Sequence, residues 1–258
     1  MTKVAKLHPL LKAKLDALGH DVHCRLSDRV MTMFVPFWWH GPRPDDSEIY
    51  HNGTLSLVDT GEKVIGITAW HVWNAYLIDL INRPPFVCQF GHVTVAPEAS
   101  RIAADERLEL ATFDLTSIYG TLQEFGAVAH RAQSWPPNRP DVADLVLYGG
   151  FPGKERQHKL VEVMYPRKTV LGMVTEVTSQ NVRVEVDYKR LFDADGNEGE
   201  IVGFDPAGSS GGPVYRIVDT PAGPDLEIVA FVCEQSELFT SMLGRHADII
   251  KADGHLVV

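Results

Sequence analysis

The sequence predicts an all-β protein in two halves, with short helices at its two ends. Short segments rich in β-branched and aromatic residues recur along the chain, separated by glycine, proline, asparagine or aspartate. The proline-rich segment 134–140 has the composition of a linker and divides the chain near its middle. With 258 residues, of which 45% are hydrophobic, the chain can bury a substantial core.

In the N-terminal half, leucines at helical spacing between Pro9 and Gly19 predict a helix over residues 9–18. We expect this helix to pack on the first half of the chain. Residues 52–71 predict a hairpin, and residues 72–82 predict a short helix after it. The other strands expected in this half lie at 30–40, 86–95 and 108–116.

In the C-terminal half, strands are expected to follow one another through short connections. They lie at 144–153 with a closing turn, 159–164, 168–177, 181–188, 214–218 and 226–232. Residues 193–199 suggest a calcium-binding loop by composition. However, the calcium-binding loop needs glycine at its sixth position, where this chain has Glu198, and glutamate at its twelfth, where it has Phe204. We therefore expect a hairpin turn. Residues 241–251 are expected to form a closing helix.

The glycine-rich segment 204–215 is the strongest functional signal. Within it Gly208, Ser210, Gly211 and Gly212 spell G-x-S-G-G. A serine hydroxyl is a weak nucleophile, so it needs an adjacent base and amide donors aimed at the oxyanion that forms when it attacks a carbonyl. Glycines leave main-chain N–H groups free to point that way. Taken alone, a glycine–serine run is more often a flexible turn or linker.

A histidine with suitable neighbours lies upstream, at the end of the expected hairpin. Thr68 and Ala69 precede His71, and a histidine placed after small residues at a strand end could serve as a general base. The chain has eleven histidines, and a lone histidine is more often a packed or surface residue. The combination of His71 with the glycine-rich serine is therefore what points to catalysis.

Together the two segments resemble the trypsin-like (chymotrypsin-fold) serine peptidases. That family carries T-A-x-H around its general base and G-x-S-G-G-P around its nucleophile, in the order base, acid, nucleophile. The matching residues here are Thr68, Ala69, His71, Gly208, Ser210, Gly211, Gly212 and Pro213. The resemblance spans roughly residues 50–235.

The resemblance implies two six-stranded antiparallel β-barrels with the active site between them. The expected divisions are an N-terminal helical extension (1–28), a first barrel (29–133), the linker (134–140), a second barrel (141–245) and a C-terminal tail (246–258). The first barrel would carry the base and the acid, and the second barrel would carry the nucleophile.

The third member of the triad departs from the family's pattern, which usually has aspartate before Leu/Ile-Ala. The matching stretch is Leu-Glu-Leu-Ala, with Glu109 in the aspartate's place. A glutamate can also hold the base in the correct tautomer. On a strand it would share a face with Ala111, so a partner for its carboxylate is expected. Asp105 and Asp114 are rival acids, whereas Asp144 falls late and should open a strand.

Further roles carry over from the resemblance. The N–H groups of Gly208 and Ser210 would form the oxyanion hole. Phe204 and Asp205 would lie at the base of the primary pocket, where Asp205 would favour a basic side chain and Phe204 a smaller or apolar one. The segment expected to pair with the substrate main chain is Cys233, Glu234 and Gln235. No metal or cofactor is expected.

Charge and cysteine content narrow the expected partners and compartment. A formal net charge of −10, without a basic block, argues against nucleic acid or an anionic membrane as the main partner. The three cysteines have no short metal-ligand spacing and are unlike a secreted disulfide framework. No signal peptide or stretch of membrane-spanning length is visible. We therefore expect a cytoplasmic protein, with a regulatory protein partner left open.

These features predict a serine endopeptidase that acts on protein or peptide substrates through Ser210, His71 and Glu109. Two alternatives stay open. The chain could be a trypsin-fold binding module that is weakly active or inactive, because fold alone does not establish activity. It could also be a serine esterase, since ester hydrolysis needs the same chemistry.

Overall fold

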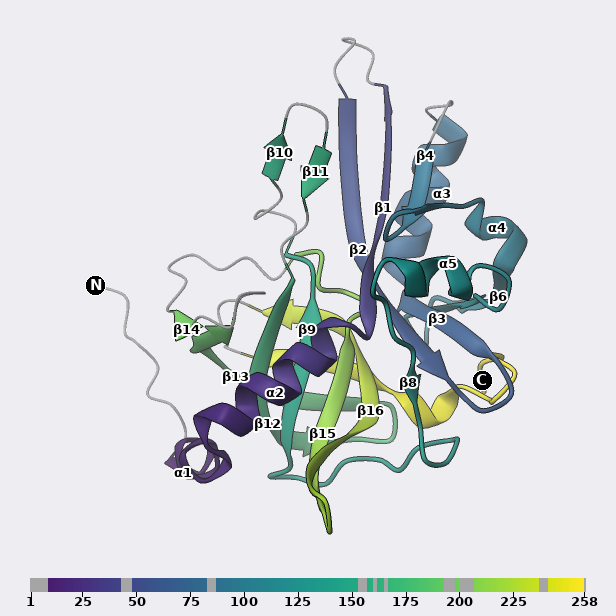
Figure 1. Cartoon of the computed structure of the whole chain (residues 1–258). Helices are drawn as coiled ribbons and strands as arrows, with labels where there is room; N and C mark the ends of the chain where they lie inside the picture. The colour runs from purple at the N-terminus through teal and green to yellow at the C-terminus, as the bar shows by residue number, and fades with distance from the viewer. Residues whose placement is uncertain are drawn as a thin grey trace.

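The computed structural model describes residues 9–42, 48–82, 87–152, 157–159, 162–164, 167–192, 198–199, 207–236 and 241–257. Most of these residues form two β-sheets, one from each half of the chain, with two helices at the N-terminal end (Figure 1). A small separate hairpin pairs β10 (Gln157–Lys159) with β11 (Glu162–Met164). Within the described residues, no helix has both the length and the apolar character needed to cross a membrane.

The first sheet has the strand order β5-β4-β1-β2-β3-β7-β6, and β8 runs parallel to β2. Its strands are β1 (Phe34–Pro42), β2 (Glu48–Asp59), β3 (Val64–Ala69), β4 (Val87–Phe90), β5 (Val93–Thr94), β6 (Arg101–Asp105), β7 (Leu110–Asp114) and β8 (His130–Arg131). No pairing between described residues closes this sheet into the barrel that the resemblance implied. Pro97 begins α4 (Pro97–Ser100) soon after β5, and a proline cannot donate to a strand ladder, so the chain leaves the sheet there.

An aromatic cluster fills the concave side of the first sheet. The Phe37 ring meets Phe90 edge-on, with centroids 5.0 Å apart, and Phe113 edge-on at 6.0 Å. The helix α3 (Trp70–Asn82) covers this cluster with the buried side chains of Trp73 and Tyr76. The short helix α5 (Tyr119–Glu124) adds the buried Leu122. This packing anchors α3, which carries His71.

The second sheet closes into a six-stranded antiparallel ring, as predicted for this half. Its order is β12-β9-β15-β16-β17-β13, and the pairing of β12 with β13 completes the ring. The strands are β9 (Leu145–Gly150), β12 (Lys168–Val177), β13 (Asn181–Phe192), β15 (Pro213–Thr220), β16 (Gly223–Ser236) and β17 (Ser241–His246), with β14 (Glu198–Gly199) beside β13. Valines dominate the interior, as expected for β-branched residues on pleated surfaces. The hairpin turn expected at 193–199 falls largely on residues 193–197, which lie outside the described residues.

Helix α2 (His20–Met31) packs mainly on strands of the second sheet, whereas the N-terminal helical segment was expected to pack on the first half of the chain. The predicted helix α1 (Pro9–Leu18) is confirmed, but a second helix, α2, follows it directly. Gly19 separates the two helices with a φ of 78°. The buried face of α2, which includes Leu26 and Val30, lies in one core cluster with residues of β9 and β12. Strand β1 therefore begins at Phe34, four residues later than the aromatic run suggested.

Residues 241–251 do not form the predicted closing helix. They form β17 and a single turn of 3₁₀ helix, η3 (Ala247–Ile249). Strand β17 pairs with both β16 and β13, so the ring would stay open without it. Gly244 fits between the side chains of Ala230 and Val182, where a Cβ would approach each within 3.2 Å. Tertiary pairing here outweighs local helix preference.

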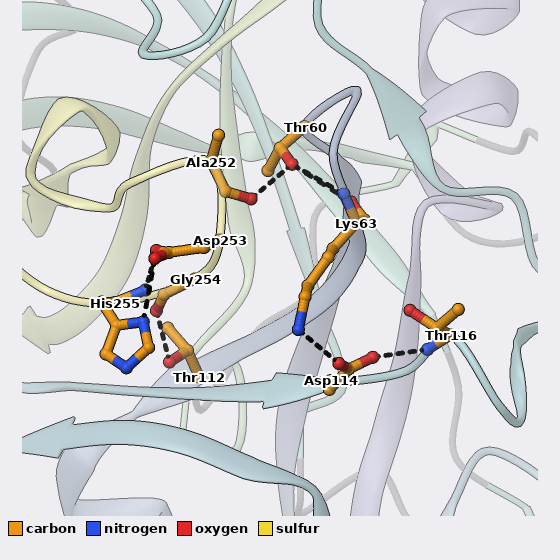
Figure 2. Close-up of polar contacts among 9 residues, drawn as sticks. All are labelled: Thr60, Lys63, Thr112, Asp114, Thr116, Ala252, Asp253, Gly254 and His255. Carbon is orange, nitrogen blue, oxygen red and sulfur yellow. Dashed lines mark hydrogen bonds and ion pairs between the residues drawn. The ribbon is translucent and has the colours of Figure 1, made fainter.

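The C-terminal segment 250–257 extends from the second sheet onto the first (Figure 2). The Thr60 hydroxyl donates to the Ala252 carbonyl at 2.7 Å, and the Thr112 hydroxyl donates to the Gly254 carbonyl at 2.8 Å. Figure 2 shows both contacts beside the Lys63–Asp114 ion pair. Gly254 has a φ of 90° and packs on Ile102. The two halves of the chain are thus joined by this segment as well as by the linker.

Gly254→Ala is expected to lower the free energy of unfolding by roughly 1–2 kcal/mol, because an L-residue is strained at this φ. A methyl group would also overlap the Ile102 side chain. Urea denaturation measures the loss. Gly61→Ala is the matched control, since Gly61 has a φ of 88° but no neighbouring atom within 4 Å of the place that a methyl group would take. Equal losses for the two variants would show that the contact with Ile102 contributes nothing.

Candidate active site

A cavity of about 250 Å³ lies where the two sheets meet. It is lined by Trp39, His51 and Asn52 from β1 and β2, by His71, Val72 and Ala75 from α3, and by Ala207, Gly208 and Ser210. The fold thus brings His71 and Ser210, which are far apart in the sequence, to one cavity. The three residues from β1 and β2 were not predicted, because no local motif marks them.

The sequence suggested that His71 lies at the end of a strand. In the structure His71 lies in the first turn of α3. Its ring Nδ1 is hydrogen-bonded to Glu109 Oε1, and its main-chain N–H donates to the same oxygen at 3.2 Å. The Trp70 N–H donates to the Glu109 main-chain carbonyl at 3.1 Å. First-turn N–H groups of a helix have no partner within the helix, and a carboxylate satisfies them well. Glu109 therefore caps α3 and holds the His71 ring at the same time.

Glu109 lies in the turn before β7, whereas the sequence suggested a strand position. It has a φ of 56°, and its N–H donates to the Glu106 carbonyl at 3.2 Å. The Leu108 N–H donates to Asp105 Oδ1 at 2.9 Å, so Asp105 stabilises this turn. The chain reverses direction here, and the Glu109 side chain extends from the turn to α3.

Arg245 of β17 supports this turn from the second sheet. Its Nη2 donates to the Arg107 carbonyl at 3.2 Å, and only 8% of the residue is exposed. Burial acts to raise the pKa of Glu109, but hydrogen bonds from the His71 ring and main-chain N–H outweigh it. The charges of His71 and Arg245 lower it further, so the pKa of Glu109 lies below its ordinary value. Glu109 is therefore ionised at neutral pH.

The rival acids contact other groups. Asp114 forms an ion pair with Lys63 at 2.8 Å, at the other end of β7 from Glu109. Burial acts to raise the pKa of Asp114, but hydrogen bonds from Lys63 and Thr116 bring it to about 2. Asp144 forms an ion pair with Arg216 at 3.3 Å, directly before β9. No hydrogen bond or ion pair between described residues joins Asp105, Asp114 or Asp144 to His71.

The glycine-rich segment around Ser210 is fixed and is not a free linker. The Gly211 N–H donates to the Val232 carbonyl at 2.7 Å, and the Val232 N–H donates to the Gly212 carbonyl at 2.8 Å. Gly208 and Gly211 have φ values of 100° and 89°. A Cβ at Gly211 would overlap the main chain of Thr54 and Thr68. Glycine is therefore required by both the backbone conformation and the close approach of the first sheet.

Thr54 of β2 ties this segment to the first sheet, and sequence reasoning missed it. Its N–H donates to the Ser210 carbonyl at 2.9 Å, and its hydroxyl donates to the Gly208 carbonyl at 2.8 Å. The same hydroxyl accepts the Phe151 N–H at 3.1 Å. Thr54 is fully buried. Thr54 thus holds the main chain on both sides of Ser209, through its side-chain hydroxyl at Gly208 and its main-chain N–H at Ser210.

Thr54→Val is expected to lower the free energy of unfolding by roughly 1–3 kcal/mol, because the Gly208 carbonyl and the Phe151 N–H lose a buried partner while the side-chain shape is kept. Urea denaturation measures this loss. The control is Thr175→Val, whose exposed hydroxyl makes one 3.4 Å hydrogen bond to the Arg183 carbonyl. Losses of the same size for both variants would contradict the role of Thr54.

The N–H groups of Gly208 and Ser210 donate no hydrogen bond to any group in the described part of the chain. They lie at the cavity that His71 and Ser210 share. Free N–H donors beside a serine can stabilise an oxyanion. Among the described residues, no hydrogen bond joins the His71 ring to the Ser210 hydroxyl.

The residues predicted to bind the substrate main chain lie on β16. Cys233 is 6% exposed, and burial raises the pKa of its thiol to about 12. Its Sγ faces the Glu109 carbonyl at 3.7 Å, so this side chain packs beneath the acid. Glu234 is exposed, and Gln235 pairs with Met242 of β17. Phe204 and Asp205 lie outside the described residues.

Among the described residues, no group of three or more histidine, cysteine, aspartate or glutamate side chains is arranged to hold a metal ion. The groups able to do chemistry at the cavity include a hydroxyl, an imidazole bound to a carboxylate, and main-chain N–H donors.

A search against models of protein families and against curated proteins found no match for this sequence. Among solved structures, the serine protease domain of Sesbania mosaic virus polyprotein has a TM-score of 0.41 and 15% identity, over 83% of this chain and 94% of that chain. A kallikrein-related peptidase 10 complex with Zn²⁺ has a TM-score of 0.42 and 12% identity, over 86% of this chain and 92% of that chain. A structure concerned with the Sesbania mosaic virus VPg protein has a TM-score of 0.42 and 14% identity, over 83% and 91%. Likeness at this level carries no conclusion about this chain.

Proposed function

We propose that this chain is a serine endopeptidase in which Ser210 is the nucleophile, His71 the general base and Glu109 the residue that orients the base. The observation that carries the proposal is that an imidazole bound to an ionised carboxylate lines the same 250 Å³ cavity as a serine in a fixed, glycine-rich turn. An imidazole held by a carboxylate keeps its other ring nitrogen available to accept a proton.

The proposed reaction is acyl transfer in two steps. His71 accepts the Ser210 hydroxyl proton while Ser210 Oγ bonds to the peptide carbonyl carbon. The carbonyl oxygen takes up negative charge, which the N–H groups of Gly208 and Ser210 stabilise. The carbon–nitrogen bond then breaks as His71 returns the proton to the leaving amine. Water attacks the resulting ester in the same way and restores the Ser210 hydroxyl.

Substrate main chain is proposed to pair with β16 at Cys233, Glu234 and Gln235. The register between β16 and β17 shifts between Val232 and Glu234, so Cys233 faces no partner residue on β17. A bulged residue leaves main-chain groups outside the ladder. Phe204 and Asp205 are proposed to lie at the base of the pocket for the residue before the cleaved bond.

The absence of a His71–Ser210 hydrogen bond between described residues favours one second candidate, a module that binds peptides without cleaving them. Catalytic hydrogen bonds are often long in unliganded enzymes and shorten when substrate binds, so the observation does not oppose catalysis. The two candidates differ in whether Ser210 reacts.

The deciding experiment combines labelling by a fluorophosphonate probe with cleavage of casein. We expect the intact protein to be labelled at Ser210, as located by peptide mapping, and to cleave casein, while Ser210→Ala does neither. An unlabelled intact protein would favour the binding module. Labelling together with hydrolysis of small esters, but without cleavage of casein, would favour an esterase.

A further inference from the structure

A second histidine–carboxylate pair borders the catalytic cavity. His51 of β2 lines the cavity, and its Nε2 lies 3.5 Å from Asp79 Oδ2 of α3. The same carboxylate oxygen accepts the Trp39 Nε1–H at 3.0 Å. The Asp79 side chain is 13% exposed and the His51 side chain 44%. A buried carboxylate thus accepts a hydrogen bond from Trp39 and lies beside the His51 ring, which lines the cavity.

The fold holds this pair rigidly beside the catalytic residues. Trp39 and His51 are register partners on β1 and β2, and their rings stack with centroids 5.5 Å apart at 19°. His71, Ala75 and Asp79 recur every four residues, so they follow one face of α3. The pair therefore lies two helical turns from the base, along the wall of the same cavity.

We propose that this cavity binds the first residue on the leaving-group side of the cleaved bond, and that His51 selects an acidic side chain there. This inference rests on the proposed function. In that function the acyl part of the substrate lies along β16, and no residue of β16 lines the cavity. The leaving amine departs on the other side of Ser210, where the cavity is.

The lining explains why an acidic side chain fits. Trp39, Val72, Ala75 and Ala207 are apolar, and the Asn52 side-chain amide already donates to the Phe151 carbonyl at 3.0 Å. Among the described lining residues, His51 supplies the imidazole besides that of His71. An imidazole beside a carboxylate can carry a positive charge, and an entering carboxylate would share it. The described residues of the cavity lining include no acidic residue that would bind a lysine or arginine side chain.

The test measures the partition of an acyl-enzyme between water and added amines, which reports binding on the leaving-group side alone. p-Nitrophenyl acetate would acetylate Ser210, and glutamic acid amide or glutamine amide would compete with water for the ester. The amine nitrogen bonds to the acetyl carbon, the bond to Ser210 Oγ breaks, and the amine proton passes through His71 to Oγ. The ratio of acetylated amide to acetate is then read by mass spectrometry.

We expect glutamic acid amide to give a ratio about 3- to 5-fold above that of glutamine amide, the size expected of a partly exposed charge pair. His51→Phe, which can keep the ring stack on Trp39, should remove this preference. The control is His40→Phe on β1, because His40 stacks on Trp38 and Tyr50 and does not line the cavity. The control should keep the preference.

Equal ratios for the two amides in the intact protein would overturn the inference, as would a preference that survives His51→Phe. Both results presuppose an acyl-enzyme, so they leave the proposed function standing. An intact protein that releases no burst of p-nitrophenol and is not labelled by the fluorophosphonate probe would instead overturn the proposed function, and this inference with it.

Discussion

Replacing His71 by alanine is expected to lower kcat/KM for a peptide substrate by about 10⁴- to 10⁶-fold, because the Ser210 hydroxyl then has no base to accept its proton. Ser210→Ala should cause a loss of the same size. The double variant should be little worse than either single one, since the two residues act as a unit. Steady-state kinetics with an internally quenched peptide measure all three.

His255→Ala is the matched control, because His255 also contacts an acid, with its Nδ1 3.2 Å from Asp253 Oδ2, but lies on the C-terminal segment away from the cavity. Its activity should stay within about twofold of the intact protein, as expected of surface substitutions far from a site. Urea denaturation of each variant checks folding. Peptide hydrolysis that persists within tenfold in His71→Ala would show that the cavity works by other chemistry.

The sequence located those features of the site that a local pattern encodes. His71 and Ser210 stand in short motifs, in the second of which a Cβ at Gly211 or Gly212 would overlap main-chain atoms, and the fold places both residues at one cavity. Strands of the C-terminal half were predicted because β-branched residues recur there in separate segments, whereas their closure into a ring was an implication of the family resemblance. Helix α2 could have been found in the same way, since Val22, Leu26 and Val30 recur every four residues.

Features that depend on distant partners could not be predicted. The segment 241–246 pairs with β13 and β16, and neither pairing is visible in its own residues. Thr54, Arg245 and Asp79 are ordinary polar residues in the sequence, and each matters here through a partner in another element. The turn at Glu109 was mistaken for a strand because the apolar residues of β7 begin immediately after it.

Glu109→Gln is expected to lower kcat/KM by roughly 10⁴-fold, the size of loss seen when the acid of such a triad becomes an amide. An amide NH₂ at this place can hold the His71 ring in the wrong tautomer, and it no longer balances the charge of the imidazolium. A loss of less than tenfold would exclude Glu109 as the orienting acid.

The same substitution should change how stability depends on pH. The pKa of Glu109 is depressed in the folded protein, so its contribution to stability is complete above the unfolded carboxyl pKa. That contribution disappears as the pH falls through the lower folded pKa. The intact protein should thus lose stability more steeply than Glu109→Gln between about pH 5 and pH 3. This is roughly the pH range in which a glutamate with a lowered pKa takes up its proton. Urea denaturation at a series of pH values measures the two slopes.

Glu109→Asp restores the acid usual in the resembling family, yet it is expected to lower kcat/KM by about 10- to 100-fold, the cost of misplacing a catalytic group by about 1 Å. Residue 109 stands in a turn, with its main-chain carbonyl held by the Trp70 N–H and its neighbour Arg107 held by Arg245. These contacts fix the backbone, so the shorter side chain has to reach α3 from the same position. Aspartate tolerates a positive φ, so the backbone of the turn should be kept, and any loss of stability should come from weakened carboxylate contacts with α3. Full activity in Glu109→Asp would mean that the turn moves toward the histidine and that its anchoring by Arg245 is weak.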